Sequence, residues 1–243
     1  MADIGTTVGV DFAASPKNTA ACEIRWCAGG AVIERVETDV DDAAFLRLLD
    51  DVPEEGRLGL DCPLGWPVGF VSAVQAHGER APWPHRDRAD RTELVWRATD
   101  RWIAERGGRW PLSVSTDRIG VTALRAAFLL DAWEAADPGR AVDRTGVAGP
   151  VVEVYPAVAR RLWGLSSVRS RDEVEARLPI RFAHSGIRDR CEMSEHVFDA
   201  LVAGLVARAA ALGRTYLPPA DLRAVAEVEG WIHVPSCAIE ELA

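Results

Sequence analysis

The chain lacks most of the features that mark the common enzyme and membrane-protein classes. No apolar run approaches the roughly 18 residues that a transmembrane helix needs. The motifs G-x-S-x-G, G-x-x-x-x-G-K-[ST] and G-x-G-x-x-G are absent, which disfavours α/β-hydrolases, P-loop enzymes and dinucleotide-binding enzymes. The start MADIGTTVGV lacks the basic and apolar parts of a signal peptide. We therefore expect a cytoplasmic protein without a membrane partner.

Cysteine and lysine are also scarce. The five cysteines are odd in number and scattered, which favours reduced thiols. Cys22 and Cys27 have no second Cys/His pair at zinc spacing, so a structural zinc is disfavoured. Lys17 is the only lysine, and the net charge of −9 argues against a strong nonspecific grip on nucleic acid. A local basic groove remains compatible with this charge.

The order of elements predicts one α/β domain over residues 1–243. A chain of this length that is 48% hydrophobic suffices for one large core. The first 60 residues predict three strands in short hairpins, then a helix and a fourth strand, in the segments TTVGVDFA, TAACEIRWC, AVIERVE, DDAAFLRLLDD and RLGLD. A mostly helical segment is inserted at about 63–149. PVVEVYPA predicts a later strand, and 195–212 a long apolar helix.

One inserted helix, VTALRAAFLLDAWEAA, has a clear apolar repeat. Leu124, Phe128 and Ala132 recur at helical spacing. We expect these three residues to form the face that packs on the core.

Four lone carboxylates lie in apolar segments: Asp11, Asp61, Glu153 and Asp199. A buried acid normally needs a partner or a metal ion. Three of the acids lie on strands and one lies on the long helix, so they can gather at one place. Mg²⁺ or Mn²⁺ prefers such oxygen ligands. The hypothesis is a divalent metal site in which all four acids are ligands and catalytic residues.

Each acid also has an ordinary alternative. Asp199 lies near a helix start, Asp11 precedes a turn, and Asp61 precedes Cys62-Pro63 and could cap a turn. Glu153 alternates with valines and could point to solvent. Asp199 resists its alternative best, because Glu195 is closer to the helix start.

Basic residues suggest where a phosphate would bind. Residues 80–110 interleave arginine with tryptophan, as phosphate and base contacts do, although acids at helical spacing also fit a solvated, salt-bridged face. The candidate substrate contacts are Lys17, Arg97, Asp100 and Arg118.

The chain resembles a known family along nearly its whole length. The resemblance is carried by VGVDFA, LDCPLGWP, RATDRW, PLSVSTDRIG, VVEVYPA, HVFDALVAGLVA and EGWIHVP. These segments are similar to domain of unknown function 429, a family of predicted nucleases of the ribonuclease H fold. The resemblance implies a ribonuclease H-like mixed sheet flanked by helices. It also implies a metal-dependent phosphodiester hydrolase acting on nucleic acid or a small phosphoester.

Two other functions remain open. One is a nucleotide or sugar-phosphate enzyme of the actin-like fold, although that fold usually doubles the domain and carries Gly-rich phosphate turns. The other is a non-catalytic binding module that kept the fold and the acids, which the acidic net charge favours over a processive nuclease.

Overall fold

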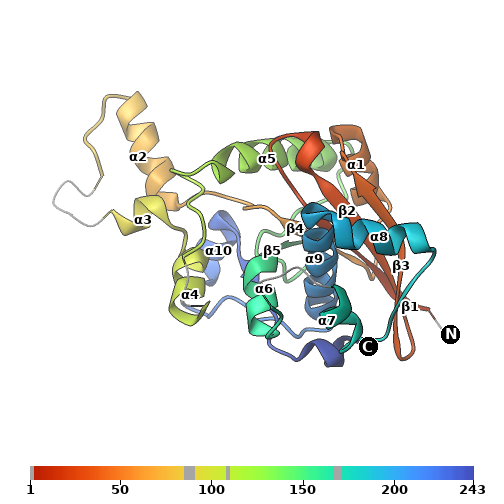
Figure 1. The fold of residues 1–243 in the computed structure, drawn as a ribbon. Coiled ribbons are helices and arrows are strands. Elements are labelled where there is room, and N and C mark those ends of the chain that lie inside the picture. Colours follow the sequence, from red (N-terminus) through yellow and green to blue (C-terminus); the bar gives the residue numbers. More distant parts are fainter. Residues whose placement is uncertain (1–2, 85–90, 108–109, 167–170) are drawn as a thin grey trace.

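The structure is a computed structural model that describes residues 3–84, 91–107, 110–166 and 171–243. Part of the arginine-rich segment, residues 85–90 and 108–109, therefore lies outside the described residues. The described chain forms one mixed β-sheet with helices on both faces (Figure 1). The prediction of a mixed α/β fold with flanking helices is confirmed.

The sheet has seven strands in the order β6-β3-β2-β1-β4-β5-β7. The first three strands form an antiparallel meander, as predicted, and β4, β5 and β7 run parallel to β1. The edge strand β6 pairs parallel to β3. The bounds are β1 (Asp3–Asp11), β2 (Ala20–Cys27), β3 (Gly30–Thr38), β4 (Arg57–Asp61), β5 (Val151–Val154), β6 (Ile180–Phe182) and β7 (Ile232–His233).

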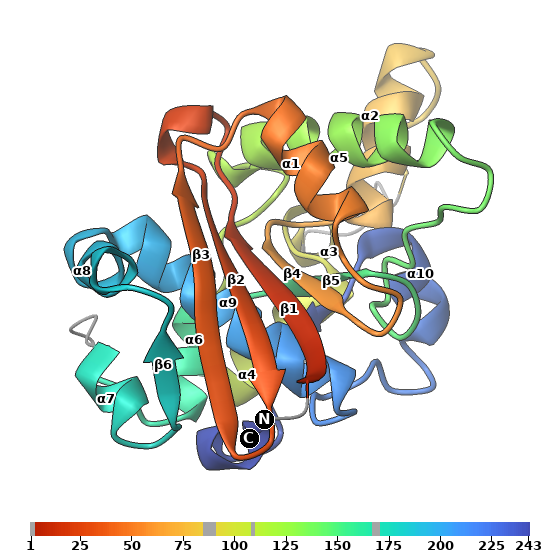
Figure 2. The ribbon, with the colours of Figure 1, turned by 90° about the vertical axis from the view of Figure 1, so that its right-hand side faces the viewer.

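Helices cover the two faces of the sheet with separate apolar cores. On one face, α1 (Asp42–Asp50) and α5 (Ile119–Ala135) pack against β1 and β4. On the other face lies α9 (Glu195–Ala211), flanked by α6 (Pro156–Leu162) and α8 (Ser185–Met193). Figure 2 shows α1 and α9 on opposite sides of the strands. None of the helices in the described ranges combines the length and apolar character that crossing a bilayer requires.

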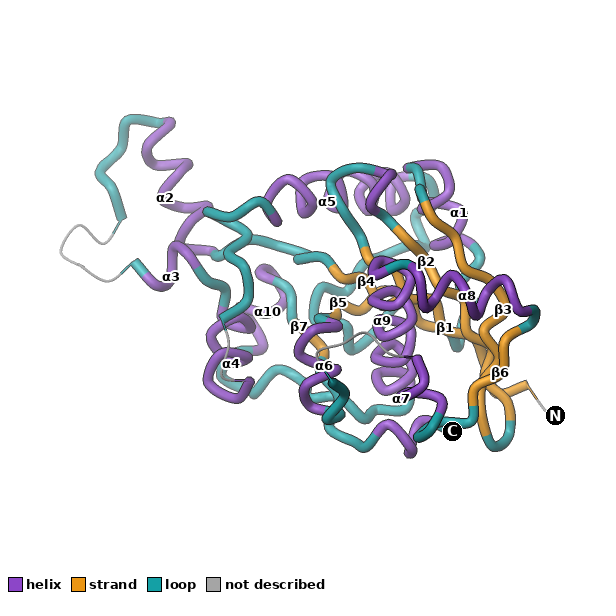
Figure 3. Tube along the Cα trace, viewed as in Figure 1, coloured by secondary structure: helices purple, strands orange, loops and turns teal. Residues whose placement is uncertain are grey.

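The remaining helices lie mainly toward the β7 edge of the sheet. The described residues of the segment 63–149 form the helices α2, α3, α4 and α5, and α2 and α3 project away from the strands (Figure 3). The helix α4 contacts α6, α10 and β7, which ties the inserted segment to the sheet. The bounds are η1 (Pro16–Asn18), α2 (Val68–Gly78), α3 (Thr92–Val95), α4 (Ala98–Gly107), α7 (Arg171–Glu175), α10 (Arg223–Glu229) and η2 (Ile239–Leu242).

Glycines allow α9 to lie directly on the sheet. A Cβ atom added to Gly9 in β1 would lie 1.9 Å from the carbonyl oxygen of Ala200 and 2.2 Å from the backbone nitrogen of Gly204. A Cβ atom on Gly59 in β4 would lie 2.4 Å from the carbonyl oxygen of Ala203. These contacts are backbone to backbone, so a side chain at either glycine would push the helix away. The close packing fixes α9 above the ends of β1 and β4.

The prediction for the core face of α5 is wrong. Leu124 and Phe128 are 63% and 68% exposed, and Ala132 is exposed as well. The buried residues of α5 are Thr122, Ala123, Ala126, Leu129, Leu130 and Trp133. The helix is apolar on two faces, so periodicity alone could not tell which one meets the sheet.

Candidate active site at the ends of β1 and β4

Asp11 and Asp61 lie side by side at one edge of the sheet. Each is the last residue of its strand, and the two are register partners across the parallel pair β1–β4. Side chains alternate along a strand, so Asp11 shares a face with Gly9, and Asp61 with Gly59. Those glycines contact α9. Both carboxylates therefore point to the face that α9 covers, and the repeated G-x-D pattern of VGVD and LGLD encodes this placement.

The first two turns of α9 add two polar side chains. The Nδ1 atom of His196 lies 2.6 Å from Oδ2 of Asp11, and the His196 side chain is 49% exposed. Asp199 forms an ion pair with Arg160 of α6, in which Oδ1 and Nη1 are 3.9 Å apart. Ser194 is the N-cap and accepts the hydrogen bond of the Val197 amide. Asp199 is thus one turn beyond the cap, and its capping alternative is excluded.

Negative charge accumulates in this group. The pKa of Asp61 is raised well above its ordinary value, first by burial and then by the charges of Asp11, Asp199 and Glu153. Arg160 opposes this rise. We call Asp11, Asp61 and Asp199 the acidic cluster. The charges of Asp11 and Asp199 thus act on Asp61, and the positive charge of Arg160 offsets them there only in part.

Glu153 points away from the acidic cluster. Glu153 is the register partner of Leu60, so the residue of β5 level with Asp61 is Val154. Val152 and Val154 pack in the core beneath α9, whereas Val151 packs in the opposite core. The alternation of the strand therefore turns Glu153 toward the other face. Sequence reasoning grouped all four acids, but the structure brings only three onto one face.

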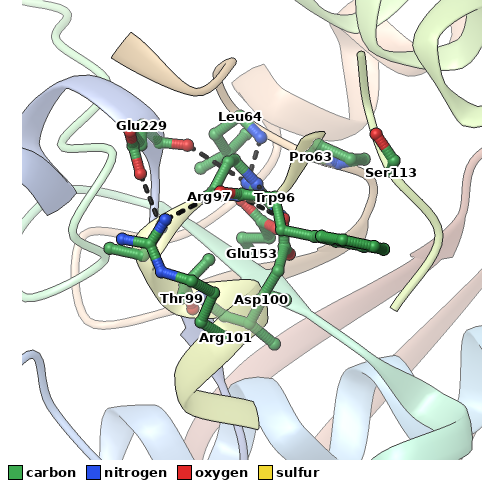
Figure 4. Close-up of polar contacts among 12 residues, drawn as sticks. Pro63, Leu64, Trp96, Arg97, Thr99, Asp100, Arg101, Ser113, Glu153 and Glu229 are labelled. Carbon is green, nitrogen blue, oxygen red and sulfur yellow. Dashed lines mark hydrogen bonds and ion pairs between the residues drawn. The ribbon is translucent and has the colours of Figure 1, made fainter. Parts of the chain in front are cut away.

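Glu153 instead joins a buried ion-pair network around Arg97, which is 2% exposed (Figure 4). Arg97 Nη2 lies 2.7 Å from Glu153 Oε1 and Nη1 lies 2.9 Å from Oε2. Asp100 accepts hydrogen bonds from Nη2 and Nε of Arg97 at 3.0 and 3.2 Å. All three side-chain nitrogens of Arg97 thus donate to carboxylates. Burial alone would lower the pKa of Arg97, but Asp100 and Glu153 raise it above its ordinary value.

The same network ties loop backbone to the sheet. Glu153 Oε2 accepts a hydrogen bond from the Leu64 amide at 2.9 Å. Arg97 Nη1 donates to the carbonyl oxygen of Glu229 at 3.1 Å, and the Glu229 carboxylate accepts from the amides of Val68 and Ala98 at 2.8 and 2.6 Å. We call Arg97, Asp100, Glu153 and Glu229 the Arg97 network. It holds the segment that follows Asp61.

A family model matches residues 9–224, and its description is "Protein of unknown function (DUF429)". The chain belongs to the DUF429 family. The matched range includes the acidic cluster and the four predicted substrate contacts, Lys17, Arg97, Asp100 and Arg118. Of the Arg97 network, only Glu229 lies outside it. A search of curated proteins and a search of solved structures found no match.

In this DUF429 protein, residues of the acidic cluster and of the Arg97 network line one small cavity of about 70 Å³. Asp61 lines the cavity together with Arg97, Asp100 and Glu153. Tyr155 and Leu112 contribute to its wall. A cavity of this size has room for a few water molecules.

The other predicted contacts of the DUF429 protein differ in exposure. Lys17 lies on η1, directly after β1, and Arg118 precedes α5; both are exposed. Arg118 neighbours Ile119, which lines the cavity. Contact of Lys17 or Arg118 with a substrate stays a prediction. Arg97 and Asp100 do line the cavity, but their charged atoms bind each other and Glu153.

The donor set of the acidic cluster suits one kind of metal ion. Within the described part of the chain, no three His, Cys, Asp or Glu side chains are grouped so that they could hold a metal ion. Mg²⁺ is commonly held by one or two carboxylates together with water and substrate phosphate. The adjacent carboxylates of Asp11 and Asp61 fit that smaller donor set.

Sequence reasoning missed Arg160. It placed His196, three residues before Asp199, near the site but not among its ligands. Arg160 follows Pro156 by four residues, and Pro156 opens the helix that leaves β5. A helix that starts at the end of a strand keeps its first turns near that edge of the sheet. This placement was the available signal for Arg160. His196 lies one turn before Ala200, which contacts Gly9, so helical spacing was the available signal for His196.

Proposed function

We propose that this DUF429 protein is a metal-dependent phosphodiester hydrolase of the nuclease type, with its active site at the ends of β1 and β4. The observation that carries the proposal is the in-register pair Asp11 and Asp61, with Asp199 facing it from α9. Burial, and after it the charges of Asp11 and Asp199, raise the pKa of Asp61. A divalent cation would relieve the repulsion between these charges, which makes these carboxylates a suitable binding site for one.

The arrangement of the chain supports the ribonuclease H-like classification that the resemblance implies. An antiparallel three-strand meander leads through a helix to a parallel fourth strand. Acids end the first and the fourth strands, and a late helix carries a third acid onto the same face. The two further strands, β6 and β7, extend the sheet at its edges.

In this proposal Asp11 and Asp61 hold Mg²⁺ or Mn²⁺, and Asp199 completes the negative surface around it. A bound divalent ion would lower the pKa of water and stabilise charge on the leaving oxygen of a phosphodiester. His196 orients the Asp11 carboxylate through the 2.6 Å contact. The Arg97 network fixes the segment after Asp61, because Glu153 binds the Leu64 amide. Glu153 is thus a positioning residue in this proposal.

Metal binding tests the proposal directly. Binding of Mn²⁺ is measured by electron paramagnetic resonance for the wild type and for Asp11→Asn and Asp61→Asn. We expect both variants to lose at least about tenfold in affinity, because each loses half of the charged donor pair. Asp221→Asn, an exposed acid outside the acidic cluster, is the matched control and should bind as the wild type does.

Hydrolysis of bis(p-nitrophenyl) phosphate, a generic phosphodiester, gives the second measurement. We expect activity that needs Mg²⁺ or Mn²⁺ and is lost in Asp11→Asn and Asp61→Asn. Unchanged Mn²⁺ affinity in both variants would overturn the proposal. Metal binding without hydrolysis of any phosphodiester would favour the non-catalytic binding module.

One observation favours a second function, acid–base hydrolysis of a phosphoester without a metal ion. The raised pKa of Asp61 suits a carboxyl group that keeps its proton and acts as a general acid. The Asp11–His196 pair has the form of an oriented general base. Activity that survives EDTA but is lost in Asp61→Asn would favour this function over the first.

A further inference from the structure

Arg160 lies at the acidic cluster, on the helix that leaves β5. The helix α6 packs against α9 and buries Val158 and Ala159. This packing directs Arg160 toward Asp199, and its side chain is 14% exposed. Its guanidinium carbon lies 6.0 Å from the ring centre of Phe198, which precedes Asp199 on α9. Arg160 is therefore held among the acids by the packing of two helices.

The guanidinium of Arg160 has hydrogen-bond donors to offer. Its Nε and Nη1 atoms are buried, and neither has a hydrogen-bond partner among the described residues. The 3.9 Å separation from Asp199 Oδ1 is an electrostatic contact that exceeds hydrogen-bond length. Buried donors are nearly always satisfied in folded proteins. An anionic ligand that binds beside Asp199 would supply the acceptors that Arg160 lacks.

Arg97 and Arg160 differ in the hydrogen-bond donors that they can offer to a ligand. All three side-chain nitrogens of Arg97 donate to Asp100, Glu153 or the carbonyl oxygen of Glu229. Arg97 can therefore bind a phosphate only by giving up buried partners. Arg160 Nη1 lies 3.9 Å from Oδ1 of Asp199, and so Arg160 lies beside the residues proposed to act on the substrate.

We propose that Arg160 is the phosphate-binding residue of this site and donates hydrogen bonds to the non-bridging oxygens of a phosphodiester. The inference rests on the proposed function and adds the cationic contact that it lacks. A planar guanidinium presents paired N–H groups that match two phosphate oxygens, which an ammonium group cannot do. The side chain would turn from Asp199 toward the phosphate when substrate binds.

The test compares Arg160→Ala and Arg160→Lys with Arg161→Ala. Arg161 is the next residue of α6 and is exposed, so it is a matched control for the loss of one charge. With bis(p-nitrophenyl) phosphate we expect kcat/KM to fall about 10- to 100-fold in Arg160→Ala, the usual cost of losing charge-assisted hydrogen bonds. Arg160→Lys should be intermediate, and Arg161→Ala should match the wild type.

Two further readouts separate phosphate binding from a role as a mere counter-ion. Inorganic phosphate should inhibit the wild type and Arg161→Ala, and should inhibit Arg160→Ala at least about tenfold more weakly. Added guanidinium chloride should restore part of the activity of Arg160→Ala. Affinity for Mn²⁺, measured by electron paramagnetic resonance, should stay equal or rise in Arg160→Ala, because a positive charge has been removed.

The inference is overturned if Arg160→Ala and Arg161→Ala have the same kcat/KM and the same inhibition by phosphate. If Arg160→Ala does not fold, Arg160→Lys decides, because it keeps the charge and loses the paired donors. If the wild type neither binds Mn²⁺ nor hydrolyses the phosphodiester, the proposed function is overturned, but the inference about Arg160 is not. Calorimetric titration with inorganic phosphate then decides for Arg160: binding lost in Arg160→Ala supports the inference, and no binding by the wild type overturns it.

Discussion

Two groups of carboxylates lie at the same edge of the sheet, on its opposite faces. In the Arg97 network, the carboxylates of Asp100, Glu153 and Glu229 accept hydrogen bonds from Arg97 or from backbone amides. In the acidic cluster, Asp11 lies 2.6 Å from the half-exposed His196, and Asp199 lies 3.9 Å from Arg160. Both groups contain three carboxylates. Burial raises the pKa of both Asp61 and Glu153, but the largest charge effect on Glu153 comes from Arg97 and lowers its pKa, whereas the largest on Asp61 comes from Asp11 and raises it. The sign of the neighbouring charge therefore distinguishes the two buried acids.

The two groups also differ in what holds them in place. The Arg97 network stabilises its own surroundings, because its hydrogen bonds connect the segments at Leu64, Val68, Ala98 and Glu229. The acidic cluster is held by the packing of the elements that carry it. Its acids stay together because α9 lies on Gly9 and Gly59 and cannot move off the sheet without losing its core contacts. The stability of the fold thus maintains the repulsion that a cation would relieve.

The largest expected effect on stability comes from removing the positive charge of the Arg97 network. Arg97→Met leaves Asp100 and Glu153 buried without their counter-charge, and we expect it to lower the free energy of unfolding by about 3–5 kcal/mol. Urea denaturation measures the loss. Arg106→Met, on the same helix but at a half-exposed side chain, should change the free energy by less than about 1 kcal/mol. A small effect of Arg97→Met would show that the Arg97 network does not stabilise the fold.

The second prediction loosens the packing that holds the acidic cluster. In Gly9→Ala the new Cβ atom would lie 1.9 Å from the Ala200 carbonyl oxygen, so α9 must shift. We expect a loss of about 1–3 kcal/mol or more, the range for overpacked cores, measured by thermal or urea unfolding. Gly78→Ala is the control, since nothing lies within 4 Å of the added atom. Equal stability of both variants would contradict the close packing of α9.

The sequence predicted one of these two groups better than the other. The ends of β1 and β4 could be predicted because apolar alternation places Asp11 and Asp61 on their strands, and the long apolar helix makes Asp199 conspicuous. Glu153 was grouped with them because pattern alone does not give strand register. A shift of one residue along β5 turns a side chain to the other face.

The Arg97 network could not be predicted because its members are distant in the chain. Glu153 lies 56 residues after Arg97, and Glu229 lies 132 residues after it. Only the folded backbone brings them together, although the spacing of Arg97 and Asp100 in RATD was visible. The prediction of the buried face of α5 was wrong for a related reason, because both sides of this helix are apolar and tertiary packing decides which one is buried.

The third prediction uses the repulsion itself. The pKa of Asp61 is raised in the folded protein, above an ordinary value of 3.8, so the folded state keeps this proton to a higher pH than the unfolded chain. The stability linked to Asp61 is complete below the ordinary pKa and falls as the pH rises through the raised one. Asp61→Asn removes this loss. We expect it to be more stable than the wild type at neutral pH, by about 1 kcal/mol.

Urea denaturation across a pH series measures the effect. The advantage of Asp61→Asn should shrink as the pH falls toward the ordinary carboxyl value, where the wild type is also protonated. The exposed Asp221→Asn should show no such trend. A variant less stable than the wild type at neutral pH would mean that Asp61 is compensated, and the contrast between the two carboxylate groups would disappear.

The smallest expected effect on stability concerns the half-exposed member of the site. His196 lies 2.6 Å from Asp11 but is 49% exposed, and solvent-exposed ion pairs contribute roughly 0–1 kcal/mol. His196→Gln should therefore leave the urea midpoint nearly unchanged, in contrast to Arg97→Met. If His196 orients Asp11, the same variant should weaken Mn²⁺ binding by roughly 10-fold, as the loss of an outer partner of a metal ligand does. Exposed Arg161→Ala should change neither quantity. A large loss of stability in His196→Gln, with intact Mn²⁺ binding, would instead place His196 with the structural group and leave Asp11 oriented by the sheet alone.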